Sequence, residues 1–128
     1  MTNKVIRTER GWAGHFICSP GCLFRRNTLL EYREQKIVVS TVGALLAGSL
    51  LSAGARHVEM VGADRYYETM AFHANPSDTR YHDADVTQAV YFDSPWDIRN
   101  PDGDDLANDM HEAVVAELTA KLKNGEIL

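Results

Sequence analysis

A charge-free stretch in the first half of the chain restricts its possible folds more than any other feature. No Lys, Arg, Asp or Glu occurs between Lys36 and Arg56, where the sequence reads IVVSTVGALLAGSLLSAGA. The stretch approaches the length of a transmembrane helix, but its serine, threonine and glycine residues make it only weakly apolar, and no membrane span is expected. The β-branched residues of 37–42 instead favour a buried strand that runs into a small-residue turn or a short helix.

Further strand signals surround this segment. We expect strands at 15–18 and 23–32, joined by a turn at Ser-Pro-Gly, because proline and glycine supply the backbone angles of a tight turn. A polar turn at 33–36 then leads into the strand at 37–42, so that these segments form a three-strand meander. Other strands are expected at 4–7, 58–61, 66–73 and 86–92, the last with a short helix as the alternative.

The clearest periodic signal lies near the end of the chain. It predicts a helix over 106–123, because every fourth residue there is apolar: Leu106, Met110, Val114, Leu118 and Leu122. Asp104 or Asp105 is expected to cap this helix, and Gly125 to end it. Three polar residues of the helix are expected to face solvent or a partner: Asn108, His111 and Glu112. The prediction is one α+β domain over residues 1–128, with an antiparallel, meander-like sheet and the C-terminal helix packed on one face.

Charge is distributed unevenly along the chain. The net charge is −5, yet residues 1–36 carry seven Lys or Arg against three Asp or Glu, so the remainder carries −9. A nucleic-acid-binding protein usually has a basic balance, so no direct nucleic-acid partner is expected. The asymmetry suits a small anionic ligand or a protein partner. The N-terminus, MTNKVIRTERG, has no apolar signal core, so a cytoplasmic location is expected.

Two cysteines, Cys18 and Cys22, flank the predicted Pro-Gly turn. A structural zinc site needs four ligands, usually in two close pairs, and here there is only one pair. A disulfide across the turn is sterically conceivable but uncommon in a reducing cytosol. The favoured interpretation is that both are small residues at strand ends, and no metal or cofactor is expected.

Two short segments carry side chains that suit a ligand. Arg25 and Arg26 are adjacent in a predicted strand and therefore face opposite sides of the sheet. Their guanidinium groups suit phosphate or carboxylate, although a structural ion pair with the C-terminal acids is equally open. The segment RYYETMAFH at 65–73 combines aromatic rings with hydroxyls, as a nucleotide site or an ordinary sheet surface would. The predicted ligand-binding residues are Arg25, Arg26, Thr28, Tyr66, Tyr67 and Thr69.

The evidence for an enzyme is poor. The chain has no phosphate-binding loop, dinucleotide fingerprint or nucleophile elbow. A metal-dependent hydrolase stays as an alternative, because imidazole and carboxylate groups can bind a divalent metal or act as acid and base. The residues for that alternative are His82, Asp83, Asp85 and His111.

Six stretches together resemble a small uncharacterised protein family of bacteriophages and prophages: RGWAGHF, FRRNTLL, IVVSTVG, RYYETMAFHA, YHDADV and ANDMHEAVVAEL. The resemblance covers nearly the whole chain. It implies an accessory factor that acts against bacterial defence in the cytoplasm of the host cell, and it brings no assigned catalytic residues.

The resemblance implies two possible mechanisms. In the first, the protein sequesters a small anionic nucleotide signal of the immune response. In the second, an acidic surface blocks a host defence protein, as anti-CRISPR proteins do. We expect the first, because the arginine and tyrosine segments are more specific than a diffuse acidic surface. We also expect a homo-oligomer without enzymatic activity.

Overall fold

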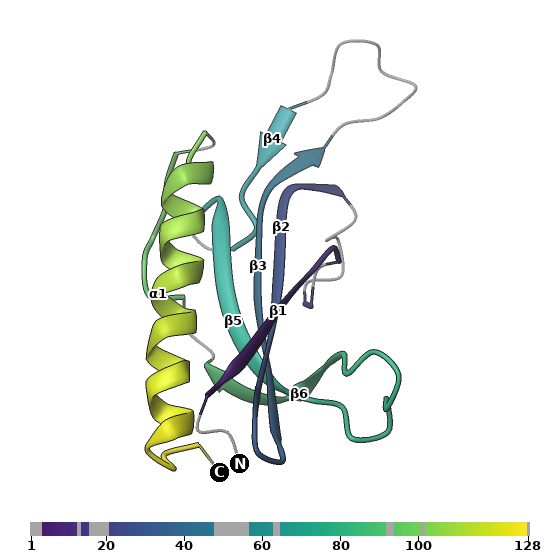
Figure 1. The fold of residues 1–128 in the computed structure, drawn as a ribbon. Helices are drawn as coiled ribbons and strands as arrows, with labels where there is room; N and C mark the ends of the chain where they lie inside the picture. The colour runs from purple at the N-terminus through teal and green to yellow at the C-terminus, as the bar shows by residue number, and fades with distance from the viewer. Residues whose placement is uncertain are drawn as a thin grey trace.

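The computed structural model describes residues 4–12, 14–15, 21–47, 57–62, 65–91, 94–100 and 102–127. The elements in chain order are β1 (Ile6–Arg10), β2 (Cys22–Tyr32), β3 (Gln35–Ala47), β4 (His57–Glu59), β5 (Tyr67–Ala74), β6 (Ala84–Tyr91) and α1 (Asp104–Lys123). All strand pairs are antiparallel, in the order β1-β2-β3-β5-β6, and β4 pairs with the end of β3. The predicted α+β class, with one helix on a meander-like sheet, is confirmed (Figure 1).

β2 and β3 form a long hairpin at the centre of the sheet. Its turn consists of two residues, Arg33 and Glu34, between the paired Tyr32 and Gln35. The predicted buried strand at 37–42 lies inside β3, which has β2 on one edge and β5 followed by β4 on the other. Its valines are buried on both faces of the sheet, which explains why this strand reads as an almost continuous apolar run.

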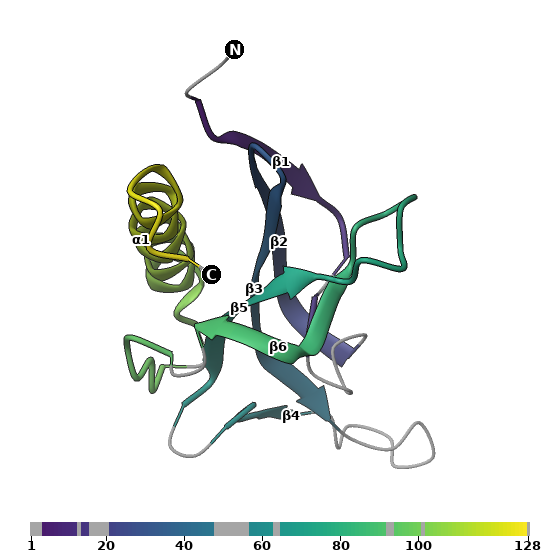
Figure 2. The same ribbon diagram turned by 90° about the horizontal axis from the view of Figure 1, so that it is seen from below.

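α1 lies along one face of the sheet, and Figure 2 shows it nearly end-on beside the strands. Leu106, which the four-residue spacing placed in the apolar stripe, is 50% exposed. An α-helix turns once every 3.6 residues, so positions four apart drift around its axis. The residues of α1 that are actually buried are Ala107, Met110, His111, Val114, Val115, Leu118 and Leu122. The outward position expected for His111 is therefore wrong.

The start of α1 differs from the prediction. The N-cap residue is Gly103, which makes no side-chain cap, and Asp104 and Asp105 lie inside the first turn. Acidic groups still stabilise this end, because they interact favourably with the helix dipole. Asp104 also accepts a hydrogen bond of 2.5 Å from the hydroxyl of Tyr67 on β5, so this carboxylate fastens α1 to the sheet.

The end of α1 follows the prediction. Gly125 has a φ of 69°, in the left-handed region that glycine tolerates best. Its N–H donates to the Leu122 carbonyl at 3.2 Å, and the Glu126 N–H donates to the Lys121 carbonyl at 2.9 Å. These two bonds form a Schellman motif. Gly125 is thus confirmed as the stop signal.

Several strand predictions need correction. The strand predicted at 15–18 falls mostly on undescribed residues, and the described partner of β2 on this edge is β1, from Asn27 to Glu31. His15 is in a bend, and residues 16–18 lie outside the described ranges, as do 48–56 of the small-residue segment. The short-helix alternative near residue 86 is wrong, since β6 is a strand.

Cys22 is buried at the start of β2, and Cys18 lies outside the described part of the chain. No helix in the described ranges combines the length and apolar character needed to cross a bilayer.

Candidate functional site

A chain of polar side chains crosses the buried interface between α1 and the sheet. His111 has no exposed surface. Its Nε2 lies 2.7 Å from the Thr28 hydroxyl on β2, and its Nδ1 lies 2.7 Å from the Thr41 hydroxyl on β3. The Thr41 hydroxyl also lies 2.6 Å from that of Thr69 on β5. Each of the three central strands therefore contributes one hydroxyl.

Four charged residues close the outer end of this chain. Arg7 donates two hydrogen bonds of 2.9 Å to Glu112 and one of 2.6 Å to Glu9. Arg26 lies 2.8 Å from Glu9 and 3.0 Å from Glu112. Because the four residues come from β1, β2 and α1, the ion pairs fasten three elements together. We call the whole group the polar seam: Arg7, Glu9, Arg26, Thr28, Thr41, Thr69, His111 and Glu112.

The carboxylate of Glu9 sets the direction of the hydrogen bonds on the Nε2 side of His111. An ionised carboxylate only accepts, so the Thr28 hydroxyl donates to Glu9 at 2.6 Å. The Thr28 oxygen then accepts from Nε2–H of His111, and in the neutral imidazole Nδ1 accepts from the Thr41 hydroxyl. The Thr41 oxygen accepts in turn from Thr69. This order holds while His111 is neutral.

The electrostatics of the polar seam agree with that order. Burial lowers the pKa of His111 to about 4, and the positive charge of Arg26 adds to the effect. Partial burial by itself raises the pKa of Glu9, but hydrogen bonds from Thr28, Arg7 and Arg26 outweigh it and bring this pKa to about 2. The hydrogen bond from Arg7 lowers the pKa of Glu112 to about 2. At neutral pH both carboxylates are charged and the imidazole is not.

The polar seam also contains three potential metal ligands. Atoms of Glu9, His111 and Glu112 lie within 4.8 Å of one another, and in the described part of the chain no other group of this kind occurs. However, Arg7 and Arg26 already neutralise both carboxylates, and two guanidinium groups repel a cation. These residues therefore fit an ion-pair network better than a metal.

His111 lies apart from the other three residues of the hydrolase alternative, which belong to the segment around the start of β6. Asp83 accepts a hydrogen bond from the Trp12 indole, and Asp85 accepts from Thr87. His82 belongs to the loop before β6, with a φ of 53°, whereas His111 lies in the polar seam. The described residues thus offer no shared metal centre at this loop.

A second buried histidine lies on the opposite face of β3. His15 Nδ1 is 2.7 Å from Ser40 Oγ, and Nε2 is 3.0 Å from Glu68 Oε1. A serine, a histidine and an acid in this order resemble a catalytic triad. Ser40 is completely buried, however, and its oxygen also accepts the Gly14 N–H at 3.0 Å. His15, which would be the base, belongs to the same segment that covers Ser40. These hydrogen bonds therefore attach residues 14–15 to the sheet.

The structure brings together only part of the predicted ligand site. Arg26, Thr28 and Thr69 all belong to the polar seam, where their polar groups bind other side chains. Arg25 is exposed and lies on the other face of β2. Tyr66 and Tyr67 belong to a cluster with Phe24 near the start of α1, and Tyr67 is fully buried.

Tyr67 also explains a glycine in the neighbouring strand. A Cβ on Gly43 would lie 2.1 Å from the Tyr67 ring, so the ring packs directly on the backbone of β3. Burial raises the pKa of Tyr67, and its hydrogen bond to Asp104 acts in the same direction. This phenol is a packing and anchoring group.

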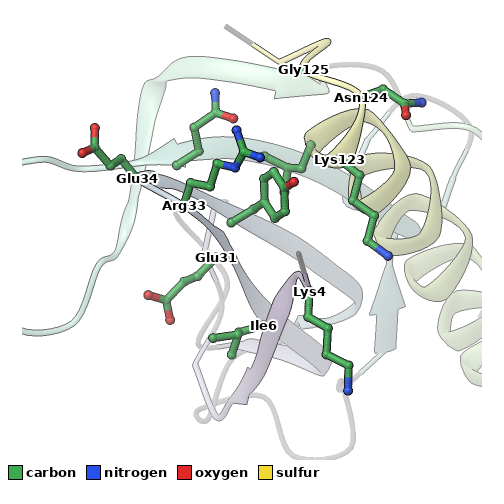
Figure 3. Close-up of a pocket in the computed structure, with 11 residues that line it drawn as sticks. Lys4, Ile6, Glu31, Arg33, Glu34, Lys123, Asn124 and Gly125 are labelled. Atoms are coloured by element: carbon green, nitrogen blue, oxygen red, sulfur yellow. The ribbon is translucent and has the colours of Figure 1, made fainter. Parts of the chain in front are cut away.

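A hollow of about 1060 Å³ opens at the other end of α1. It lies between the last turn of α1, the β2–β3 turn and the start of β1. We call it the end hollow, and its lining residues are Lys4, Ile6, Glu31, Tyr32, Arg33, Glu34, Gln35, Leu122, Lys123, Asn124 and Gly125. Figure 3 shows Glu31 and Glu34 on its left side, Lys4 and Lys123 on its right side, and Arg33 between them.

Arg33 is the most unusual residue of the end hollow. It occupies the two-residue turn with a φ of 57°, a conformation that is uncommon for residues with a side chain. Its guanidinium carbon lies 5.2 Å from the centre of the Tyr32 ring, at cation–π distance. Among the described residues, no carboxylate forms an ion pair with Arg33 or Lys123.

Sequence reasoning missed the end hollow and the role of His111. The β2–β3 turn was interpreted only as polar, although an arginine where glycine or asparagine is usual is a signal that a sequence can show. The burial of His111 has no comparable local signal. No protein-family description, curated protein or solved structure matches this chain.

Proposed function

We propose that the protein binds a small anionic ligand in the end hollow and acts by holding it. The observation that carries this proposal is the pair Arg33 and Lys123, two cations beside one cavity with no ion-pair partner among the described residues. Phosphate and carboxylate are the groups that such side chains bind.

The shape and lining of the end hollow support a ligand of nucleotide type. Its volume of about 1060 Å³ is at the upper end of the range for small-molecule sites. The guanidinium of Arg33 is stacked over Tyr32, and a planar cation of this kind suits the face of a nucleobase. Lys123 supplies a second cation for a phosphate, while Glu31 and Glu34 can accept hydrogen bonds from hydroxyl or amino groups.

The backbone of Arg33 gives further support. A left-handed conformation costs a residue with a side chain roughly 1–2 kcal/mol, and such strain is concentrated at functional sites. An arginine held in this position keeps its guanidinium over Tyr32 before any ligand arrives. The wider role, interference with a bacterial immune signal, stays a prediction of the sequence resemblance.

A thermal-shift assay with pyrophosphate, adenine nucleotides, cyclic nucleotides and ADP-ribose tests the proposal. A ligand at 100 times its Kd adds about 2.7 kcal/mol to the stability. We expect Arg33→Gly and Lys123→Ala to remove the shift. The matched control, Arg25→Ala, removes an exposed arginine of the same sheet and is expected to keep it.

Two outcomes would contradict anion binding at this place. The first is the absence of a shift across the whole panel. The second is a shift that Arg25→Ala abolishes and Arg33→Gly leaves intact, which would return the site to the face of β2 that carries Arg25. If no ligand binds but the protein co-purifies with a host defence complex, the acidic-blocker mechanism is favoured instead.

A further inference from the structure

The centre and the outer end of the polar seam respond to acid at different pH. The unfolded chain binds a proton at His111 near pH 6.5, whereas the folded chain binds it only near pH 4. Glu9 and Glu112 keep their charge until about pH 2. Between about pH 6.5 and pH 4, protonation of His111 therefore favours the unfolded chain while the ion pairs of Glu9 and Glu112 are still intact.

We infer that the polar seam is an acid-sensitive clasp, in which neutral His111 holds α1 on the sheet and protonated His111 loosens it. The inference concerns the ligand-free protein and does not depend on the proposed function.

The first argument is the direction of the hydrogen bonds. Neutral His111 accepts from Thr41 at Nδ1, and Thr41 accepts from Thr69. A proton on Nδ1 forces the Thr41 hydroxyl to turn and donate to Thr69. The Thr69 hydroxyl is fully buried and then loses its acceptor, since the described residues offer it no other side-chain partner. An unsatisfied buried donor destabilises the folded state.

The second argument is the charge around the imidazole. β1 presents Arg7 and Glu9 to it, β2 presents Arg26, and α1 itself contributes Glu112. These four charges cancel in pairs, while β3 and β5 present only the hydroxyls of the polar seam. An imidazolium would thus be an extra positive charge in a buried place, next to guanidinium groups that are already paired.

The sign of the pH effect follows from the proton count. Between pH 6.5 and pH 4 the unfolded chain binds more protons at His111 than the folded chain does. The stability therefore falls as the pH falls through this window. The loss begins at α1, because His111 is a residue of that helix and both of its ring nitrogens bind the sheet.

The clasp has a consequence for the end hollow, and this consequence alone depends on the proposed function. Leu122 and Lys123 of α1 line the hollow, so a loosened helix would carry one of the two cations away from Arg33. Acid would then release the ligand before the sheet unfolds.

Hydrogen exchange of the α1 amides tests the clasp in ligand-free protein. After correction for intrinsic exchange rates, we expect the opening equilibrium of α1 to rise on the order of tenfold between about pH 7.5 and pH 5. His111→Gln should remove this rise, because glutamine does not titrate yet can donate to Thr28 and accept from Thr41. His15→Gln is the matched control, a buried histidine on the opposite face of β3, and should keep it.

The proposal is overturned if opening of the wild-type helix is unchanged between the two pH values, or if the rise survives in His111→Gln. Should that variant fail to fold, an NMR titration of the wild-type ring decides. A neutral Nε2–H tautomer down to about pH 5 supports the clasp, and titration near pH 6.5 without faster exchange in α1 refutes it. Since no ligand is added, failure here leaves the thermal-shift result untouched.

Discussion

The polar seam and the end hollow use similar side chains in opposite ways. In the seam, Arg7 and Arg26 each contact both Glu9 and Glu112. Carboxylates of the same chain therefore neutralise the charge of both arginines. In the hollow, Arg33 stacks on an aromatic ring and lines an open cavity. The difference teaches that an arginine in a strand is a weak sign of ligand binding until its acidic neighbours are known.

The largest effect should come from the centre of the polar seam. His111→Leu removes one of the hydrogen-bond partners of each of two buried hydroxyls, those of Thr28 and Thr41. We expect a loss of about 2–4 kcal/mol in the free energy of unfolding, measured by urea denaturation at neutral pH. Asn108→Leu, at an exposed position of the same helix, should change it by less than about 0.5 kcal/mol. If both variants lost a similar amount of unfolding free energy, the polar seam would not stabilise the fold more than an exposed position of α1 does.

An intermediate effect should separate the two adjacent arginines of β2. Arg26→Gln removes two charge-assisted contacts from the outer end of the seam, and we expect a loss of about 1–2 kcal/mol. Arg25→Gln changes an exposed side chain on the other face and should be nearly neutral. In about 1 M salt the difference between the two stability losses should become smaller, because salt screens the exposed part of the ion-pair network. Equal effects would contradict the structural role of Arg26.

The smallest effect on stability should come from the end hollow. Arg33→Gly relieves a left-handed backbone but also frees the unfolded chain. The two effects oppose each other, and we expect the free energy of unfolding to change by less than about 1 kcal/mol. A loss larger than that for His111→Leu would mean that Arg33 is a structural residue, and the contrast between seam and hollow would fail.

Features with a local cause were predictable from the sequence. The β-branched run at 37–42 marks the centre of the sheet, the apolar repeat marks α1, and Gly125 marks its end. In each case neighbouring residues carry the whole signal. The partner of β2 was not predictable in this way, because pairing with β1 depends on contacts between Asn27–Glu31 and Ile6–Arg10 and not on a nearby turn.

The candidate site was less predictable for the same reason. Arg26, Thr28 and Thr69 were predicted to bind a ligand, and the structure brings them together in the polar seam, where they contact other side chains. They meet around His111, whose burial depends on a polar patch in the middle of a sheet face. No periodicity within α1 reveals that patch, so the helix pattern alone placed this histidine on the wrong side.

Ser40 and Thr41 are consecutive in β3, and they hold His15 and His111 on opposite faces of the sheet. A shift of β3 by one residue in either direction would bring a valine, Val39 or Val42, against one of the two histidines. Because successive strand residues alternate between faces, such a slip is normally penalised by exposure of apolar groups. Here both faces are buried and valines lie on each, so that penalty is weak. The two hydroxyls give the chain another means of rejecting a misaligned sheet during folding.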